Sequence, residues 1–166
     1  QTFHSRPELC LNASHILYLS GNFELAENKI AQAEQMLDSL PASSGTEQML
    51  ARASLYRGAI ASVRGDTQQA IEKITFAQER LPRENYLLQA RGYFSLGLAY
   101  ELSGQSELAV QNYLRSSQEA QSAGVLYLAI HALGAAAQVQ ISQGQLHRAE
   151  QACQSAIQIA GGKRLP

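Results

Sequence analysis

Residues 91–124 read RGYFSLGLAYELSGQSELAVQNYLRSSQEAQSAG, and this stretch decides the fold. Apolar and small residues recur every three or four positions on both sides of Gly104, and polar residues fill most of the gaps. Such spacing places the apolar residues on one face of a helix. A glycine after a helix can adopt the left-handed conformation that ends it without a Cβ penalty. The stretch therefore predicts two amphipathic helices that form a hairpin with its turn at Gly104.

The same turn recurs along the chain at intervals of 44, 39 and 40 residues. The turn glycines are Gly21, Gly65, Gly104 and Gly144. Five residues after each glycine stands an alanine, namely Ala26, Ala70, Ala109 and Ala149. Small side chains at a helix interface let the two axes approach to roughly 8–10 Å. This repetition in register predicts four helical hairpins.

We expect these hairpins at about residues 5–40, 46–81, 84–123 and 126–160. Ser5 to Glu8 has the pattern of a capping box, and Pro82 ends the second hairpin. Hairpins with short connections can bury their apolar faces only on one another. The expected fold is an all-α, right-handed α-solenoid of about eight helices, which forms a single domain over 1–166 and lines its concave face with the first helix of each hairpin.

Composition and charge narrow the possible functions. The net charge is −1, with 13 basic and 14 acidic residues and no long run of either sign, so direct contact with nucleic acid is not expected. Cys10 and Cys153 lie far apart, and none of the four histidines has a partner at metal-ligand spacing. We therefore expect no metal site, no catalytic residue and a non-enzymatic role, although a triad assembled from distant residues is an alternative that residue order does not decide. The sequence contains neither a secretory segment nor an apolar run of membrane length, which favours a cytoplasmic protein.

The central hairpin resembles a tetratricopeptide repeat. The resemblance rests on the order of a large aromatic residue, a Leu-Gly pair, a tyrosine, the turn glycine, an alanine, a second aromatic and a small residue. In this chain these are Tyr93, Leu96, Gly97, Tyr100, Gly104, Ala109, Tyr113 and Ser116. Such repeats usually span about 34 residues, so intervals near 40 imply longer helices.

A narrower resemblance rests on four stretches of sequence. They are SRPELCL at 5–11, LSGNFELAE at 19–27, ARGYFSLGLAY at 90–100 with LSG at 102–104, and GGKRLP at 161–166. These stretches are similar to the repeat region of MalT-like, large ATP-binding LuxR-type transcriptional regulators. The resemblance implies that the chain is a fragment of a longer protein, in which a nucleotide-binding domain and a helix-turn-helix domain flank a region that senses an inducer or a regulatory protein. This sequence has no phosphate-binding loop, so ATP is implied only for the parent protein and no cofactor is expected in this segment.

The repeat register points to a candidate binding groove. Arg52 and Arg91 occupy the same place in successive first helices, and His131 occupies that place in the fourth hairpin. The register adds Tyr56, Ser95 and Gln138 to the same face. Arginines along a groove can clamp a carboxylate or an acidic peptide, and a solvated helix face is the alternative interpretation.

Two functions follow from this hypothesis. The first is a non-catalytic sensor segment of a transcriptional regulator that binds a small inducer or a regulatory protein on the concave face. The alternative is a general scaffold that docks peptides and has no link to transcription. Because a repeat array that ends without a polar capping helix exposes an apolar end face, self-association through the solenoid ends is a further expectation.

Overall fold

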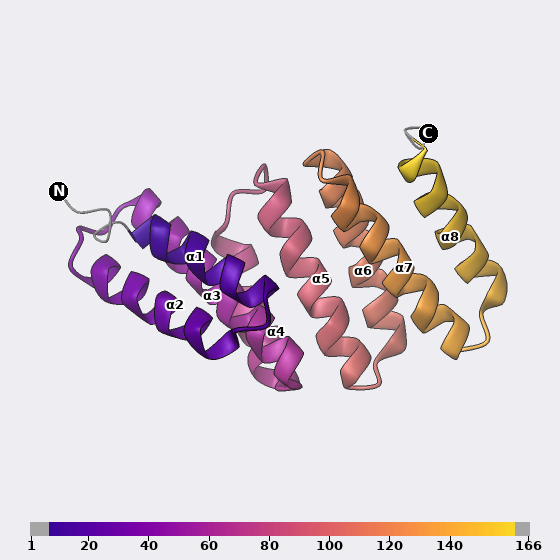
Figure 1. The fold of residues 1–166 in the computed structure, drawn as a ribbon, viewed down its shortest axis with the longest axis horizontal. Coiled ribbons are helices and arrows are strands. Elements are labelled where there is room, and N and C mark those ends of the chain that lie inside the picture. The colour runs from indigo at the N-terminus through magenta and orange to yellow at the C-terminus, as the bar shows by residue number, and fades with distance from the viewer. Residues whose placement is uncertain (1–6, 162–166) are drawn as a thin grey trace.

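The structure is a computed structural model that describes residues 7–161, and this range forms eight α-helices without a strand (Figure 1). The helices are α1 (Pro7–Leu19), α2 (Phe23–Asp38), α3 (Ser44–Arg64), α4 (Thr67–Arg80), α5 (Tyr86–Leu102), α6 (Ser106–Ser122), α7 (Leu126–Ser142) and α8 (Leu146–Ala160). Helix α3 begins two residues before the expected position because the Ser43 hydroxyl accepts a hydrogen bond from Thr46 N at 3.2 Å and caps the helix. Ser5 and Arg6 of the expected capping box, and most of the closing GGKRLP stretch, lie outside the described residues.

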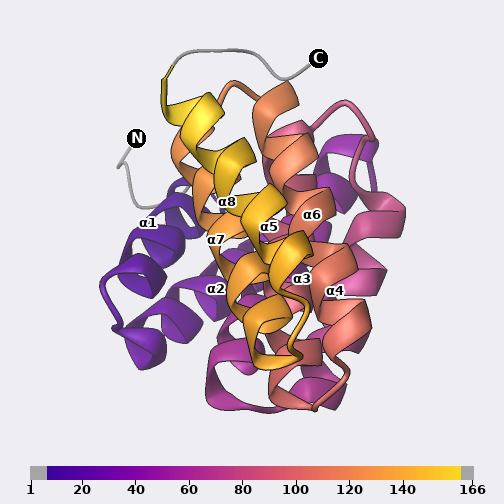
Figure 2. The ribbon, with the colours of Figure 1, turned by 90° about the vertical axis from the view of Figure 1, so that its right-hand side faces the viewer.

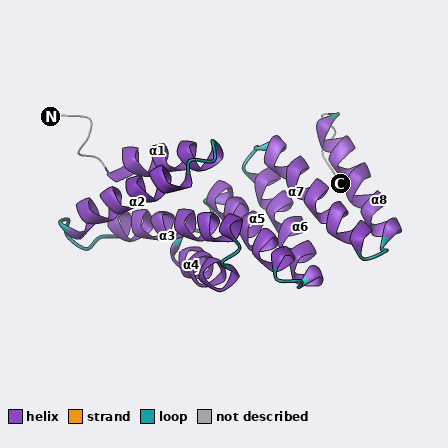
Figure 3. Cartoon of the chain, turned by 60° about the horizontal axis from the view of Figure 1, so that its bottom comes forward, coloured by secondary structure: helices purple, strands orange, loops and turns teal. Residues whose placement is uncertain are grey.

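The eight helices pair into four hairpins that stack along the long axis of the molecule (Figure 1). Viewed from one end, α7 and α8 lie in front of the earlier helices (Figure 2). The loops that join consecutive helices are short, so each hairpin packs on its neighbours in the sequence (Figure 3). This arrangement is an α-solenoid and confirms the predicted fold class.

A left-handed glycine makes the turn within each hairpin. The φ angles of Gly21, Gly65, Gly104 and Gly144 are 78°, 79°, 78° and 72°. At the end of α5, Gln105 N donates to Tyr100 O at 2.8 Å and Gly104 N donates to Glu101 O at 3.0 Å. These two bonds form a Schellman motif, which satisfies carbonyl groups that the end of the helix would otherwise leave free.

Small residues hold the two helices of a hairpin close together. Ala26, Ala70 and Ala109 are fully buried, and Ala149 is nearly so. Glycine extends the same role on the facing helix, because a Cβ at Gly58 would lie 2.5 Å from Ile74 Cγ1 and 3.2 Å from Ala70 O. The two helices of a hairpin therefore approach closely enough for their backbones to come near contact, and larger residues at these positions would prevent this approach.

The odd-numbered helices form one face of the stack. Helix α3 contacts both α1 and α5, and α5 also contacts α7. The helix direction changes along the array, since α1 and α2 lie at a clear angle to α7 and α8 (Figure 1). This rotation determines which residues of successive repeats come together on the odd-numbered face.

Candidate functional site

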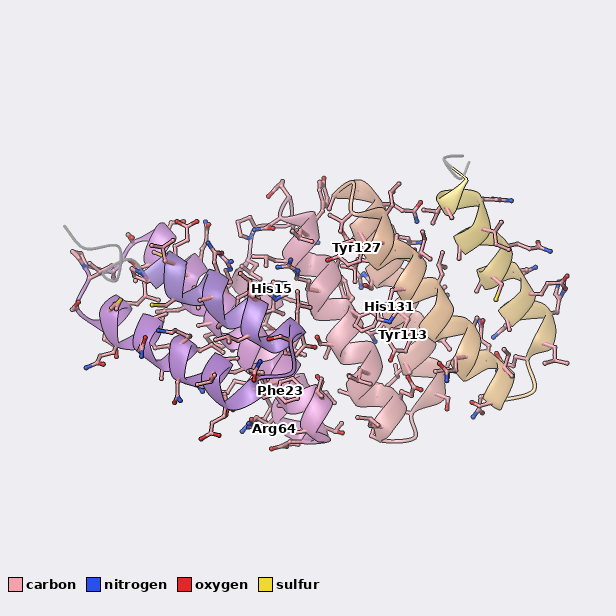
Figure 4. All side chains as sticks on the ribbon, viewed as in Figure 1. His15, Phe23, Arg64, Tyr113, Tyr127 and His131 are labelled. Atoms are coloured by element: carbon pink, nitrogen blue, oxygen red, sulfur yellow. The ribbon has the colours of Figure 1, made fainter. Side chains whose placement is uncertain are left out.

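A pocket of about 180 Å³ opens on the face formed by the odd-numbered helices. We call it the aromatic pocket. It is lined by His15, Tyr18 and Leu19 of α1, Leu55, Tyr56 and Ala59 of α3, Arg91, Phe94 and Ser95 of α5, and Tyr127, Leu128 and His131 of α7. Figure 4 shows His15 on one side of α5 and Tyr127 and His131 on the other. Each of the four hairpins therefore contributes its first helix to one site.

The Tyr56 hydroxyl is the polar centre of the pocket. It accepts a hydrogen bond from Arg52 Nε at 2.9 Å and a longer one from Arg91 Nη1 at 3.5 Å. A phenol oxygen that accepts from two guanidinium groups still has its own proton to donate. Arg52 also donates through Nη2 to the side-chain oxygen of Asn12, which fixes the guanidinium between α1 and α3. Two guanidinium groups therefore meet at the hydroxyl of Tyr56, which lines the pocket.

Stacked rings form the apolar walls. The ring of His15 stacks on that of Tyr56, with centroids 5.3 Å apart and planes 17° from parallel. On the opposite wall the ring of His131 stacks on that of Phe94, with centroids 4.8 Å apart. Phe94 in turn packs against the buried ring of Tyr113. These ring pairs hold the wall side chains in defined orientations, since offset-stacked aromatic pairs are favourable.

The pocket carries positive charge that no described carboxylate balances. None of the described residues that line it is acidic. Within residues 7–161, Arg52 and Arg91 form no ion pair, whereas Arg57 and Arg64 of α3 pair with Glu34 and Glu27 of α2. An unpaired guanidinium beside a partly enclosed apolar surface favours an anionic ligand, because the attraction is stronger where water is partly excluded.

The protonation of His15 reflects the same charges. Burial lowers its pKa from 6.5 to about 4, with further contributions from the positive charges of Arg91 and Arg52. His15 is therefore neutral at pH 7 and adds a flat, uncharged ring to the pocket. The cationic character of the site at neutral pH comes from the two arginines.

The structure brings together most of the residues that the repeat register predicted. Tyr56, Arg91, Ser95 and His131 line the aromatic pocket. Arg52 does not line it but hydrogen-bonds to the hydroxyl of Tyr56, so it lies directly behind the lining. Gln138 is exposed on α7 and lies outside the pocket. The repeat register therefore does not predict the position of Gln138 relative to this pocket.

The lining follows a diagonal across the repeats rather than one register position. His15 stands six residues before its turn glycine, Tyr56 nine before, Arg91 thirteen before and Tyr127 seventeen before. The shift is three or four residues per repeat, which is one helical turn of about 5.4 Å. His15, Tyr18 and Tyr127 were missed for this reason, and the signal that could have revealed them is the presence of aromatic residues near this diagonal.

Two further observations concern the described part of the chain. No helix between residues 7 and 161 is long and apolar enough to cross a bilayer. The same residues contain no cluster of three or more histidine, cysteine or acidic side chains with a geometry suitable for a metal ion.

Stacked helical hairpins with a pocket on one face define a class of proteins, the α-solenoid interaction scaffolds. Within this chain, residues 90–120 match the family model of the tetratricopeptide repeat. The matched segment covers most of α5 and α6, the hairpin whose spacing predicted the fold. A comparison with curated proteins gave no match. The chain therefore contains a tetratricopeptide-like region, and repeats of this kind serve as protein-interaction scaffolds.

Proposed function

We propose that the aromatic pocket binds a short acidic peptide segment of a partner protein. The observation that carries the proposal is the convergence of Arg52, Arg91 and the Tyr56 hydroxyl beside an apolar cavity with no described carboxylate to neutralise them. A ligand carboxylate there accepts charge-assisted hydrogen bonds, which are stronger than neutral ones. The fitting ligand is a peptide with a carboxylate next to an apolar or aromatic side chain.

The volume of the pocket favours an anchoring side chain over a complete drug-sized molecule. Pockets for such molecules are about 300–1,000 Å³, and a dry cavity of about 150 Å³ in another protein holds one benzene ring. At about 180 Å³, the aromatic pocket has room for one ring or branched aliphatic group. The exposed side chains of Leu19 and Tyr127 flank the opening, where they can contact the neighbouring residues of a bound peptide.

A peptide array tests this proposal. Immobilised peptides in which a glutamate precedes a phenylalanine or leucine are compared with copies in which glutamine replaces the glutamate. We expect the chain to retain the acidic peptides and to lose most of its binding to the glutamine copies. Affinities of the retained peptides are then measured by fluorescence polarisation.

Two arginine variants link that binding to the pocket. Arg91→Ala and Arg52→Ala are each expected to weaken the peptide about tenfold or more, since a hydrogen bond to a charged group contributes about 1.5–3 kcal/mol. Arg148→Ala on α8 is the control, because Arg148 is exposed and lies outside the aromatic pocket. Unchanged affinity in both Arg52→Ala and Arg91→Ala would sink the proposal.

The narrower proposal is that this pocket belongs to the sensor region of a cytoplasmic transcriptional regulator and receives a small inducer or a regulatory protein. Its support is the sequence resemblance to the repeat region of MalT-like, LuxR-type regulators, together with a pocket on the face formed by the first helices of the hairpins. The coding sequence on either side of the segment tests it. A phosphate-binding loop upstream and a helix-turn-helix downstream are expected, and the absence of both would leave the scaffold function alone.

A further inference from the structure

A second cavity, of about 220 Å³, lies between α4, α5 and α6, and it is lined mainly by polar residues. We call it the amide cavity. Its polar lining residues are Gln78, Glu79, Arg83, Gln89, Arg115 and Glu119. It shares no residue with the aromatic pocket, so an inference about it does not depend on peptide binding.

One buried amide nitrogen among the lining residues has no partner. Gln78 Nε2 is buried and has no hydrogen-bond partner among the described residues. An unsatisfied buried donor costs about 1–3 kcal/mol, so such a group is expected to meet an acceptor from water or a ligand. Gln89, which is only 6% exposed, places a second amide in the lining.

Gly92 makes room for the Gln78 amide. A Cβ at residue 92 would lie 3.0 Å from Gln78 Nε2, so an alanine there would press on the amide. Glycine inside a helix costs about 1 kcal/mol relative to alanine. Glu34 occupies the corresponding position in the first repeat and accepts two hydrogen bonds from Arg57 of α3. Gln78 Nε2, in contrast, has no hydrogen-bond partner among the described residues.

Charges of both signs surround the amides. The guanidinium carbon of Arg115 lies 4.6 Å from the centroid of the Tyr93 ring, and this cation–π contact orients the guanidinium group beside the cavity. Arg83 and Arg115 form no ion pair with a described carboxylate. The carboxylates of Glu79 and Glu119 also line the cavity, and Glu79 is 3.4 Å from Arg80 in an exposed pair.

We propose that the amide cavity binds a free α-amino acid. Its carboxylate accepts hydrogen bonds from Arg115 and Arg83, and its ammonium group donates to Glu119 or Glu79, all of which line the cavity. A simple dianion is disfavoured by the two glutamates and a simple cation by the two arginines, so the charge pattern fits a zwitterion. The volume is about that of seven waters at roughly 30 Å³ each, which suits a molecule of amino-acid size.

Titration of the ¹⁵N-labelled chain with each of the twenty L-amino acids tests this proposal. At least one is expected to shift the amide signals of α4, α5 and α6 with a millimolar or tighter Kd. Acetate and methylammonium, which carry the two charges separately, are expected to bind at least tenfold more weakly. Failure of all twenty amino acids, or acetate binding as tightly as the best of them, would overturn the proposal.

Variants connect the binding to the cavity. Arg115→Gln and Glu119→Gln are each expected to weaken the binding of the best amino acid at least fivefold. Arg148→Gln on α8 is the matched control and is expected to bind normally, because Arg148 lies outside the cavity. Unchanged affinity in both Arg115→Gln and Glu119→Gln would overturn the assignment to this cavity, even if an amino acid binds elsewhere.

Discussion

The ring of Tyr113 on α6 packs against the Cα of Gly97 on α5 so closely that a Cβ at residue 97 would lie 2.5 Å from Cδ1 and 2.6 Å from Cε1 of the ring. The ring is buried, and its hydroxyl donates to Glu101 Oε2 at 2.7 Å. Burial, and then the hydrogen bond to Glu101, raise the pKa of the Tyr113 hydroxyl well above its usual value of 10. Gly97 is therefore required by the packing of one aromatic ring.

Gly97→Ala is expected to lower the free energy of unfolding by about 1–3 kcal/mol, because overpacking forces side chains from their preferred rotamers. Gly134→Ala on α7 is the matched control, since no atom lies within 4 Å of its Cβ position. It is expected to raise stability by up to about 1 kcal/mol through helix propensity alone. Urea denaturation measures both, and equal effects of the same sign would contradict this role of Tyr113.

The variant Tyr56→Phe distinguishes the contribution of the Tyr56 hydroxyl to peptide binding from that of its ring. The variant keeps the ring that stacks on His15 but removes the oxygen that accepts from Arg52 and Arg91. We expect acidic peptides to bind about five- to tenfold more weakly, which corresponds to about 1–1.4 kcal/mol. Tyr86→Phe, on the exposed start of α5 and outside the pocket, should bind normally, and equal affinities of both variants would contradict the role of the hydroxyl.

The lowered pKa of His15 predicts that stability depends on pH. The folded chain holds His15 neutral down to about pH 4, whereas the unfolded chain protonates it near pH 6.5. The contribution to stability is therefore complete above pH 6.5 and is lost as the pH falls toward 4. We expect a loss of about 1–2 kcal/mol, because His15 is only partly buried and solvent screens part of the effect.

His15→Phe keeps a ring in the same place and removes the titration. Urea denaturation at several pH values is expected to give a flatter profile between pH 6.5 and 4 for this variant than for the native chain. His147→Gln, at an exposed site on α8, should leave the native slope unchanged. A His15→Phe profile as steep as that of the native chain would contradict the assignment to His15.

The ion pair between Glu34 and Arg57 joins the first hairpin to the second. Arg57 donates from Nε to Glu34 Oε1 at 3.0 Å and from Nη2 to Oε2 at 2.6 Å, and this hydrogen bond raises the pKa of Arg57. Glu34→Gln is expected to cost about 0.5–1 kcal/mol, because both side chains are partly exposed and water weakens the pair. Glu27→Gln breaks a single-contact pair with the more exposed Arg64 and should cost less.

A double-mutant cycle of Glu34 and Arg57 to alanine measures the coupling directly. A coupling free energy indistinguishable from zero would contradict the claim that the two-bond pair of Glu34 and Arg57 stabilises the fold.

Self-association through the solenoid ends stays a prediction from the sequence. On the last described helix, α8, Leu146 is 66% exposed and Ile157 is 70% exposed, and Cys153 lies between them in the sequence and is also exposed. Light scattering in reductant is expected to show a mass that rises with concentration. Ile157→Lys is expected to shift the chain toward the monomer, whereas a native monomer at high concentration would contradict the prediction.

The hairpins could be predicted from the sequence because their signals are local. Turn glycines such as Gly104 and the buried alanines such as Ala109 follow from backbone conformation and helix spacing. The pairing of Arg52 with Arg91 also came from the repeat register, and both reach the hydroxyl of Tyr56. The register placed Tyr56, Arg91, Ser95 and His131 on one face, and these residues line the aromatic pocket, but it did not define the boundary of that pocket.

Gln138 and His15 show where the sequence was insufficient. They occupy the same place before their turn glycines, yet His15 lines the aromatic pocket and Gln138 lies outside it. The pocket shifts by one helical turn per repeat, and this shift comes from the way whole hairpins rotate as they stack. The amide cavity likewise depends on residues of three helices, so no single stretch of sequence indicates it.

By itself the sequence determined the helices, their turns and the face of each helix that is buried, because these depend on residues three or four positions apart. Only the tertiary structure decided which side chains of different repeats meet. The relative rotation of neighbouring hairpins depends on all the side chains packed between them, including close contacts such as that of Tyr113 with Gly97. The pattern of one repeat therefore predicts its hairpin, and the stacking of four hairpins creates the aromatic pocket.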